Sequence, residues 1–485
     1  ISINDSIFSG KKKNQGEIMK TLRGAKNSTV KLGVQRGNSP ELLYFDVTRG
    51  DVPVNSVDVS YEAAKGIGYI KVSKFARNTY NEFITAIAKL KQAGCTSFVI
   101  DLRGNTGGYM DAAINMINEF MPEGRLIVYT EGKSFPRSDV YANGTGTCKD
   151  APIVVLTDEI SASASEIFSG AIQDNDRGTI IGRRTYGKGL VQTQMSLSDG
   201  SEMRLTIARY YTPSGRCIQK KYEMGNTDAY DQDIYNRYMH GEFDSADSIK
   251  MDDSLKYQTV GGRTVYGGGG IMPDIFIPRD TSGVTSYYSN VVNSGVLYLY
   301  ALEYSDRHRE KLGSFKTWEE LYNYLQQQPL LSDFVNFAAT KGIKRRPTLI
   351  NISGKLIENQ LQAYIVRNFF DEAGFYPILL KYDVITCDQY RARGKIRAEC
   401  GTIKTISEWR LTQPSRPYEK IWPLERKNIR GLPCASYRIR SWTAWNRRNC
   451  SKQLLVSPFI TPYREKYRPP ALSRNGTGRK SFCCP

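Results

Sequence analysis

Two hydrophobic periods alternate in the first half of the chain and predict strands followed by helices. Residues 68–75 (GYIKVSKF) have a strand pattern, and apolar residues at helical spacing then predict a helix over about 79–93. Residues 96–102 (TSFVIDL) are almost continuously apolar, which predicts a strand buried on both faces. A second amphipathic helix is expected over about 109–121, and further strands at 126–130, 152–157 and 179–182, with a helix between the last two. This order predicts a mainly parallel sheet covered by helices.

The two predicted helices show which side chains face the core. Thr79 and Glu82 have the spacing of a capping box, and Gly94 can take the left-handed conformation that ends a helix. The inward positions are Tyr80, Phe83, Ile84, Ile87 and Leu90 in the first helix, and Ala113, Ile114, Ile117, Phe120 and Met121 in the second.

Two later segments have patterns of their own. Residues 191–211 predict a hairpin that turns at Asp199-Gly200, and alternation at Met203, Leu205 and Ile207 predicts that it anchors the preceding segment to the core. Residues of about 290–375 have a helical pattern, which predicts a C-terminal helical domain. Bracing of the core and oligomerisation both stay open as its role.

Two loops follow buried strands and are expected to meet at one edge of the sheet. They are residues 101–108 (DLRGNTGG) and 158–165 (DEISASAS), and ligands of open α/β sheets bind beyond the carboxyl ends of the strands. A glycine-rich turn can aim free N–H groups at a ligand. The structural alternatives are a plain strand-to-helix turn in the first loop and a helix cap in the second, because Ser163 and Glu166 have capping-box spacing.

The formal charge of +18 suggests nucleic acid or an anionic surface until the charges are located. Residues 381–485 hold 23 Lys and Arg against 7 Asp and Glu, which leaves the rest of the chain almost neutral. This last segment lacks periodicity and holds six of the nine cysteines, at spacings that match no zinc motif. We therefore predict a non-globular tail over 387–485, where the reading frame has drifted, rather than a nucleic-acid-binding domain.

The chain contains only two histidines, which bears on any serine nucleophile. His240 and His308 both lie in polar stretches, so a Ser-His-Asp triad is not expected. Lysine can act as the base instead when an apolar pocket favours its neutral form. Lys188 lies between two glycines, and Gln192 would return to the same strand face; the alternative is an ordinary surface lysine.

The motifs DLRGNTGG (101–108), SASASEIFSGAIQDND (161–176) and TYGKGLVQ (185–192) together resemble the carboxy-terminal processing peptidases, also called tail-specific proteases. Residues 200–219 and 268–278 match the same family, so the resemblance runs over about 1–380. It implies that Ser163 is the nucleophile, Lys188 the general base and Gln192 the group that orients the lysine. It also implies an oxyanion hole formed by the amide of Ala164 and that of Gly107 or Gly108, two alternatives that stay open.

The resemblance implies an α/β protease core related to the crotonase-like spiral fold. Residues 1–56 resemble the later part of a PDZ domain, with alternating apolar residues at Val30, Leu32 and Val34. The predicted domains are a partial PDZ domain over 1–56, the protease core over 57–289 with a surface insertion at about 221–260, a helical domain over 290–386, and the tail over 387–485.

The function implied is a serine endopeptidase that cleaves C-terminal regions of proteins through an acyl-enzyme, with neither metal nor organic cofactor. The expected partners are proteins or peptides with exposed C-termini, whereas nucleic acid is not expected. Formation of a homo-oligomer stays open. The chain begins at Ile1 without a targeting segment and has no stretch of about eighteen apolar residues that would span a membrane. It is expected to derive from a larger precursor of the periplasm or cell envelope. The alternative function is a catalytically silent peptide-binding scaffold.

Overall fold

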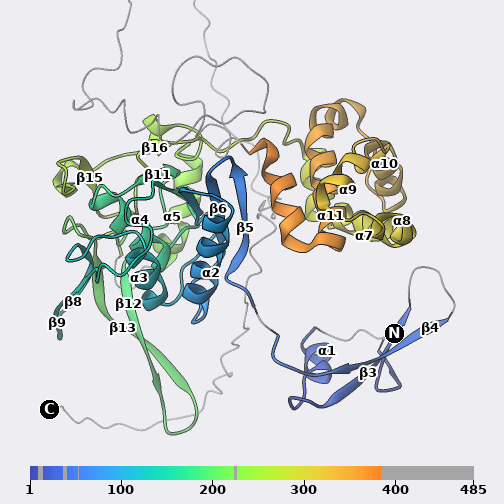
Figure 1. Cartoon of the computed structure of the whole chain (residues 1–485), viewed down its shortest axis with the longest axis horizontal. Coiled ribbons are helices and arrows are strands. Elements are labelled where there is room, and N and C mark those ends of the chain that lie inside the picture. The colour runs from blue at the N-terminus through green and yellow to red at the C-terminus, as the bar shows by residue number, and fades with distance from the viewer. Residues whose placement is uncertain (9–14, 36–40, 53, 223–226, 384–485) are drawn as a thin grey trace, which may run out of the picture.

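The computed structural model describes residues 1–8, 15–35, 41–52, 54–222 and 227–383 (Figure 1). The predicted tail over 387–485 and its cysteines lie outside the described residues. Three groups of elements follow one another along the chain: a small N-terminal sheet, a central α/β body and a C-terminal set of helices.

A six-stranded sheet forms the centre of the body, in the order β16-β11-β10-β7-β6-β5. Its first five strands pair in parallel, and β5 is antiparallel to β6, so the predicted mainly parallel sheet is confirmed. All five residues of β7 are buried, as its continuous apolar run predicts. The bounds are β5 (Val57–Ala64), β6 (Ile67–Val72), β7 (Ser97–Asp101), β10 (Ile153–Thr157), β11 (Thr179–Gly182) and β16 (Ile275–Phe276).

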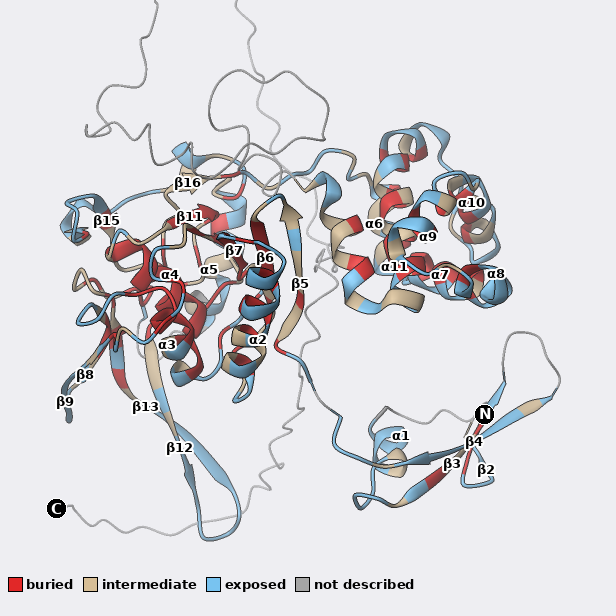
Figure 2. Ribbon diagram, in the orientation of Figure 1, coloured by how far each residue is buried: buried red, intermediate tan, exposed pale blue. Residues whose placement is uncertain are grey.

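Three helices pack on this sheet around one hydrophobic core, namely α2 (Thr79–Gln92), α3 (Met110–Asn118) and α4 (Ala164–Asp174). The first ends just before Gly94, whose φ is +90°. The predicted inward residues of the two helices belong to or pack against this core, except Ile84, which is only half-buried and lies outside it. Every residue of α4 is buried, which fits a helix enclosed by other elements (Figure 2).

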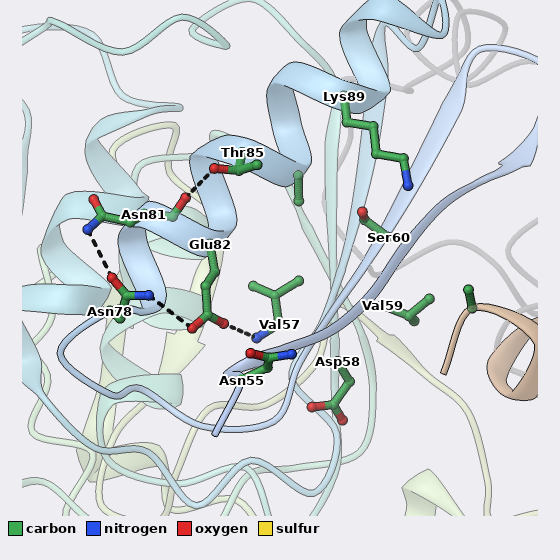
Figure 3. A pocket seen from close by; sticks show the side chains of 12 residues that line it. Asn55, Val57, Asp58, Val59, Ser60, Asn78, Asn81, Glu82, Thr85 and Lys89 are labelled. Atoms are coloured by element: carbon green, nitrogen blue, oxygen red, sulfur yellow. Dashed lines mark hydrogen bonds between the residues drawn. The ribbon is translucent and has the colours of Figure 1, made fainter. Parts of the chain in front are cut away.

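The predicted capping box at the start of α2 is wrong. The N-cap is Asn78, and it makes no side-chain cap hydrogen bond. Glu82 is used elsewhere: its Oε2 accepts the backbone N–H groups of Ser56 and Val57 at 2.6 and 2.9 Å (Figure 3). The carboxylate therefore fixes the start of β5. The groove drawn in Figure 3 lies between α2 and β5 and is lined by none of the predicted catalytic residues.

Residues 126–130 do form a strand, but it does not join the parallel sheet. Strand β8 (Leu126–Gly132) belongs to a second, antiparallel sheet of order β12-β13-β8-β9. The other strands are β9 (Phe135–Tyr141), β12 (Leu190–Ser196) and β13 (Glu202–Tyr211).

The outer part of the β12–β13 hairpin does not pack on the core, contrary to what the alternation at Met203 and Leu205 predicts. These side chains are 41% and 47% exposed, because no described element covers the outer part of the hairpin (Figure 2). At its base Ala208 and Tyr210 are buried, on the opposite strand face. The hairpin is therefore attached to the body at its base.

Residues 221–260 include α5 (Thr227–Met239), two short 3-10 helices (Ala246–Ser248 and Asp253–Leu255) and β14 (Lys256–Gln258), which pairs with β15 (Thr264–Tyr266). This segment is only in part a surface feature. Arg237 is buried, and its guanidinium donates to the carbonyl oxygens of Arg184 and Thr185 at 2.8 and 2.9 Å. The segment thus supports the loop that leads to Lys188.

The N-terminal group consists of a four-stranded sheet and one helix, with strand order β2-β1-β3-β4. Of the alternating residues Val30, Leu32 and Val34, only Val30 is fully buried, since no described element covers the rest of that face. The assignment of a partial PDZ domain stays a prediction. The bounds are β1 (Ser2–Ile3), β2 (Ser6–Ile7), α1 (Gln15–Leu22), β3 (Thr29–Gln35) and β4 (Leu42–Thr48).

The C-terminal helices share a separate hydrophobic core. They are α6 (Ser286–Asn293), α7 (Val296–Arg307), α8 (Arg309–Gly313), α9 (Trp318–Leu325), α10 (Leu330–Thr340) and α11 (Pro347–Leu379), followed by a 3-10 turn at Leu380–Tyr382. Helix α11 kinks at Asp371, whose φ is +50°. Beyond the kink, the Tyr376 hydroxyl donates to Asp58 at 2.7 Å and so links the helices to β5.

Candidate active site

Ser163 lies at the junction between the loop after β10 and the first residue of α4. Its backbone has φ +57° and ψ −114°, a left-handed region that non-glycine residues rarely adopt. Such a conformation costs about 1–3 kcal/mol and persists only where the surrounding structure imposes it. The side chain is half-buried, whereas Ala164 next to it is fully buried.

The two loops that follow β7 and β10 meet at this point, as the sequence predicts. The Ala162 N–H donates to the Asn105 carbonyl at 3.0 Å. The Ser161 hydroxyl donates to the Leu102 carbonyl at 2.8 Å, and the Ser165 hydroxyl to the Asn105 carbonyl at 2.9 Å. Two of the three alternating serines therefore join the loops, which leaves Ser163 for another role.

Free N–H groups lie beside Ser163. The Gly107 N–H is occupied, because it donates to the Asn105 side chain at 2.8 Å. Gly108 pairs with Phe75 in a parallel bridge, in which the Gly107 carbonyl and the Tyr109 N–H make the bonds. The N–H of Gly108 consequently points away from Phe75 and has no partner within the described ranges.

Ala164 supplies a second free N–H, because the first N–H groups of a helix have no partner inside it. The Gly107 turn lies directly against this group: a Cβ built on Gly107 would be 2.9 Å from the Ala164 nitrogen and 2.7 Å from Ser163 Cβ. The Ala164 N–H therefore lies beside the Gly107 turn, next to Ser163. The oxyanion hole itself stays a prediction, and the hydrogen bond of the Gly107 N–H to Asn105 leaves Gly108 as the candidate for its second donor.

Glu166 connects the segments that carry Ser163 and Lys188. Its Oε2 accepts the backbone N–H groups of both residues, each at 2.8 Å. Its Oε1 accepts the Gly187 N–H and the Thr185 hydroxyl, each at 2.6 Å. Burial raises the pKa of Glu166, and these four donors oppose the rise. Because four donors fill the acceptor positions of both oxygens, the group is bound as a carboxylate.

Lys188 lies in the loop between β11 and β12 and is half-buried. No hydrogen bond joins its ammonium group to the Ser163 hydroxyl in the part of the chain that the structure describes. The Tyr210 hydroxyl lies between the two residues instead, 2.9 Å from Ser163 Oγ and 2.8 Å from the Lys188 carbonyl oxygen. Burial raises the pKa of Tyr210, so this phenol keeps its proton.

The role of Gln192 stays a prediction. Its side chain is exposed, and its amide nitrogen lies 3.5 Å from Thr206 Oγ1 across the hairpin. A bulge between Val191 and Gln192 shifts the strand register, so simple alternation from Lys188 does not hold there. His240 and His308 are both exposed.

Sequence reasoning missed two contributors to this site. The sequence predicts Glu166 only as half of a helix cap, although its four hydrogen bonds reach well beyond α4. The predicted alternation of the hairpin does not include Tyr210, because Met203, Leu205 and Ile207 lie on the other face of β13. A polar-tipped aromatic residue at a buried strand position, within a motif of the resemblance, is the signal that would have found it.

A buried ionic network holds the loop after β7. Asp101 accepts hydrogen bonds from the Tyr69 hydroxyl at 2.6 Å, from Lys71 at 3.3 Å and from the Arg103 guanidinium at 2.7 Å. Burial opposes ionisation of Asp101, but the charges of Arg103 and Lys71 hold its pKa below its usual range. The network therefore fixes the first residues of the loop that leads to Gly108.

Within the described ranges, no three His, Cys, Asp or Glu side chains are grouped so that they could hold a metal ion. In the same part of the chain, every helix is too short or too polar to cross a membrane.

Comparisons with known proteins match the body and the helices separately. Residues 66–228 match the model of peptidase family S41, and residues 287–371 match a family of unknown function, DUF8443. A carboxyl-terminal-processing protease of Synechocystis sp. is 36% identical over 207 residues, which are 42% of this chain and 48% of that protein. The carboxy-terminal processing protease CtpB of Bacillus subtilis is 33% identical over 223 residues, 46% of each chain.

The chain thus spans about half the length of these curated relatives. A solved structure of a photosystem II D1 C-terminal processing protease aligns with a TM-score of 0.33 and 25% identity, over 57% of this chain and 62% of the other. The alternative of a catalytically silent scaffold is not favoured by the family match. The match to the model of peptidase family S41 covers the segment that contains both Ser163 and Lys188.

Proposed function

We propose that the chain is a serine endopeptidase that cleaves C-terminal regions of proteins through an acyl-enzyme. Ser163 is the nucleophile and Lys188 the general base. The amides of Ala164 and Gly108 form the oxyanion hole. Gln192 enters this proposal from the family resemblance alone, as the residue that orients Lys188 when substrate is bound.

The observation that carries the proposal is the strained backbone of Ser163 beside two unpaired N–H groups. Ala164 begins α4, so its N–H and the positive end of the helix dipole face the position of a developing oxyanion. The Gly108 N–H is directed away from its only bridge partner. Backbone strain of this kind occurs at functional sites, where the surrounding structure imposes it.

The chemistry follows from these positions. Ser163 Oγ attacks the peptide carbonyl while its proton passes to neutral Lys188, and the carbonyl oxygen gains the negative charge that the two amides stabilise. Protonated Lys188 then gives its proton to the leaving amine, and water releases the acyl group. In the present arrangement Lys188 and Ser163 are not hydrogen-bonded, so a movement of the lysine side chain precedes catalysis.

Active-site labelling tests the assignment of the nucleophile. The full chain is treated with a biotinylated fluorophosphonate, which reacts with activated serines, and the modified peptide is identified by mass spectrometry. Modification at Ser163 in the native protein, absent after denaturation and in Ser163→Ala, supports the proposal. Labelling elsewhere, or none, contradicts it.

Specificity for C-terminal segments, a periplasmic or envelope location and homo-oligomer formation are further parts of the proposal that rest on the resemblance. The first has a direct test with paired peptides that end in a free acid or an amide. Preference for the free acid is expected if residues 1–56 contribute a PDZ-type carboxylate site. Equal cleavage of both peptides would count against terminal recognition without affecting the assignment of Ser163.

A further inference from the structure

We propose that Tyr210 is a third catalytic residue, whose phenol orients the Ser163 hydroxyl and donates to Ser163 Oγ as that oxygen loses its proton. This inference rests on the proposed function, because it takes Ser163 as the nucleophile. The phenol contacts the reacting atom directly, 2.9 Å from Ser163 Oγ, and lies 2.8 Å from the carbonyl oxygen of Lys188.

The proton count at the phenol permits two arrangements. The Lys188 carbonyl can only accept a hydrogen bond, whereas the Ser163 hydroxyl can donate or accept, and Tyr210 has a single proton. In the first arrangement, the Tyr210 hydroxyl donates a hydrogen bond to the Lys188 carbonyl and accepts one from the Ser163 hydroxyl. In the second, Tyr210 donates to Ser163 Oγ, and the Ser163 proton is free to point elsewhere.

The two arrangements correspond to the resting enzyme and to the reacting one. In the first, the Ser163 hydroxyl donates to the phenol oxygen of Tyr210, which is a weak acceptor, so Lys188 cannot remove the proton. In the second, the Oγ–H bond breaks and its proton passes to Lys188 Nζ, while Oγ forms a bond to the peptide carbonyl carbon and the electron pair of the carbonyl moves to oxygen. Tyr210 transfers no proton in this step; its hydrogen bond stabilises the charge on Oγ before the new bond is complete.

The surroundings of Tyr210 suit a fixed donor. The residue is 4% exposed, and its backbone N–H donates to the Gly189 carbonyl at 3.0 Å. It pairs with Thr130 on the neighbouring strand, so β13 is held from both sides at this position. Because burial raises its pKa, the phenol stays protonated over the working pH range and acts as a donor rather than a base.

Tyr211 provides a matched control on the same strand. Its ring stacks on Tyr129, with centroids 4.8 Å apart, and strand alternation directs it away from Ser163. Tyr210→Phe and Tyr211→Phe both remove one hydroxyl and keep the ring. Only the first leaves Ser163 Oγ without its hydrogen bond.

The experiment compares the full-length wild type with these two variants. It measures kcat and KM on a fluorescent unfolded casein and the rate of fluorophosphonate labelling at Ser163. Tyr210→Phe should lower kcat and the labelling rate by about 10- to 100-fold, as expected for one lost hydrogen bond to a reacting charge, with KM within about twofold. Tyr211→Phe should change each value by less than about threefold.

A second variant separates hydrogen-bond donation from packing. Replacement of Tyr210 by 3,5-difluorotyrosine keeps the shape of the side chain but makes the phenol ionise at lower pH. If the phenol donates to Oγ, kcat should fall at alkaline pH in this variant and stay level in the wild type. The difluorotyrosine profile decides the matter even if Tyr210→Phe does not fold.

The outcomes distinguish the two levels of the proposal. Wild-type kcat and labelling in Tyr210→Phe, or an unchanged alkaline profile in the difluorotyrosine variant, would overturn the role of Tyr210 and leave Ser163 as the nucleophile. Failure of the wild type to be labelled at Ser163 would instead overturn the proposed function.

Discussion

The carboxylate of Glu166 accepts the backbone N–H of Lys188 at 2.8 Å, across 22 residues of sequence. The same oxygen accepts the N–H of Ser163, so one buried side chain sets the separation of the two segments that the proposed reaction requires. The relative position of these segments therefore depends on a carboxylate that touches neither reacting side chain.

Glu166→Gln should lower both stability and activity. The new NH2 group would face two N–H or O–H donors, which leaves buried donors unsatisfied at about 1–3 kcal/mol each. We expect the free energy of unfolding in urea to fall by about 2–5 kcal/mol and kcat/KM to fall with it. Glu202→Gln is the control, because Glu202 is exposed on the hairpin and its replacement should cost less than about 0.5 kcal/mol. Equal stability of the two variants would contradict the role of Glu166.

Two glycines of the loop after β7 allow the effect of backbone strain to be tested separately from the effect of steric exclusion. Gly104 has φ +71° and open space around a built Cβ, so Gly104→Ala should cost about 1 kcal/mol and leave kcat/KM unchanged. Gly107 has φ +96°, and its Cβ would lie 2.6 Å from the Ala162 carbonyl oxygen. Gly107→Ala should therefore abolish Ser163 labelling even where the protein remains folded by circular dichroism. Full labelling of Gly107→Ala would mean that the turn does not shape the site.

The Asp101 network predicts how stability depends on pH. The folded pKa of Asp101 lies below the unfolded value of about 3.9, so its contribution is fully present above about pH 4 and is lost as pH falls through the folded pKa. Asp101→Asn leaves Lys71 without its carboxylate and Arg103 with Asp383 alone, and should cost about 3–5 kcal/mol at pH 7. Denaturant unfolding between pH 7 and pH 3 should show that the difference in free energy of unfolding between wild type and variant becomes smaller on acidification. A difference in free energy of unfolding that grows at low pH would contradict this prediction.

The Ser-Lys assignment makes predictions for substitutions. Lys188→Arg should abolish turnover without unfolding the protein, because guanidinium stays charged at any working pH and cannot accept the Ser163 proton. Ser163→Ala should be equally inactive, and the double variant hardly worse, since the members of a catalytic unit are not additive.

The histidines are the control for this assignment. His240 and His308 are exposed, so their joint replacement should leave kcat/KM within a few fold. An active Lys188→Arg enzyme, or loss of activity on removing both histidines, would refute the Ser-Lys dyad.

The sequence by itself determined the parallel sheet and the meeting of its two loops. Alternating and continuous apolar runs report burial directly, and the right-handed connections of parallel strands bring their carboxyl ends to one edge. The pattern therefore located strand β7, helix α2 and the loop of Ser163 within a few residues. The assignment of Ser163 and Lys188 comes from motif spacing and the family resemblance, and it stays a prediction.

Only the tertiary structure decided which donors and acceptors meet around them. The proposal of Gly108 rather than Gly107 for the oxyanion hole rests on a hydrogen bond from Gly107 to Asn105 that no periodicity reveals. The register shift before Gln192 and the exposed outer hairpin arise from which elements cover which face, and strand alternation does not encode this. Tyr210 reaches Ser163 across 47 residues because the antiparallel sheet packs against helix α4 through β8, a long-range relationship set by the whole fold and not by any local segment.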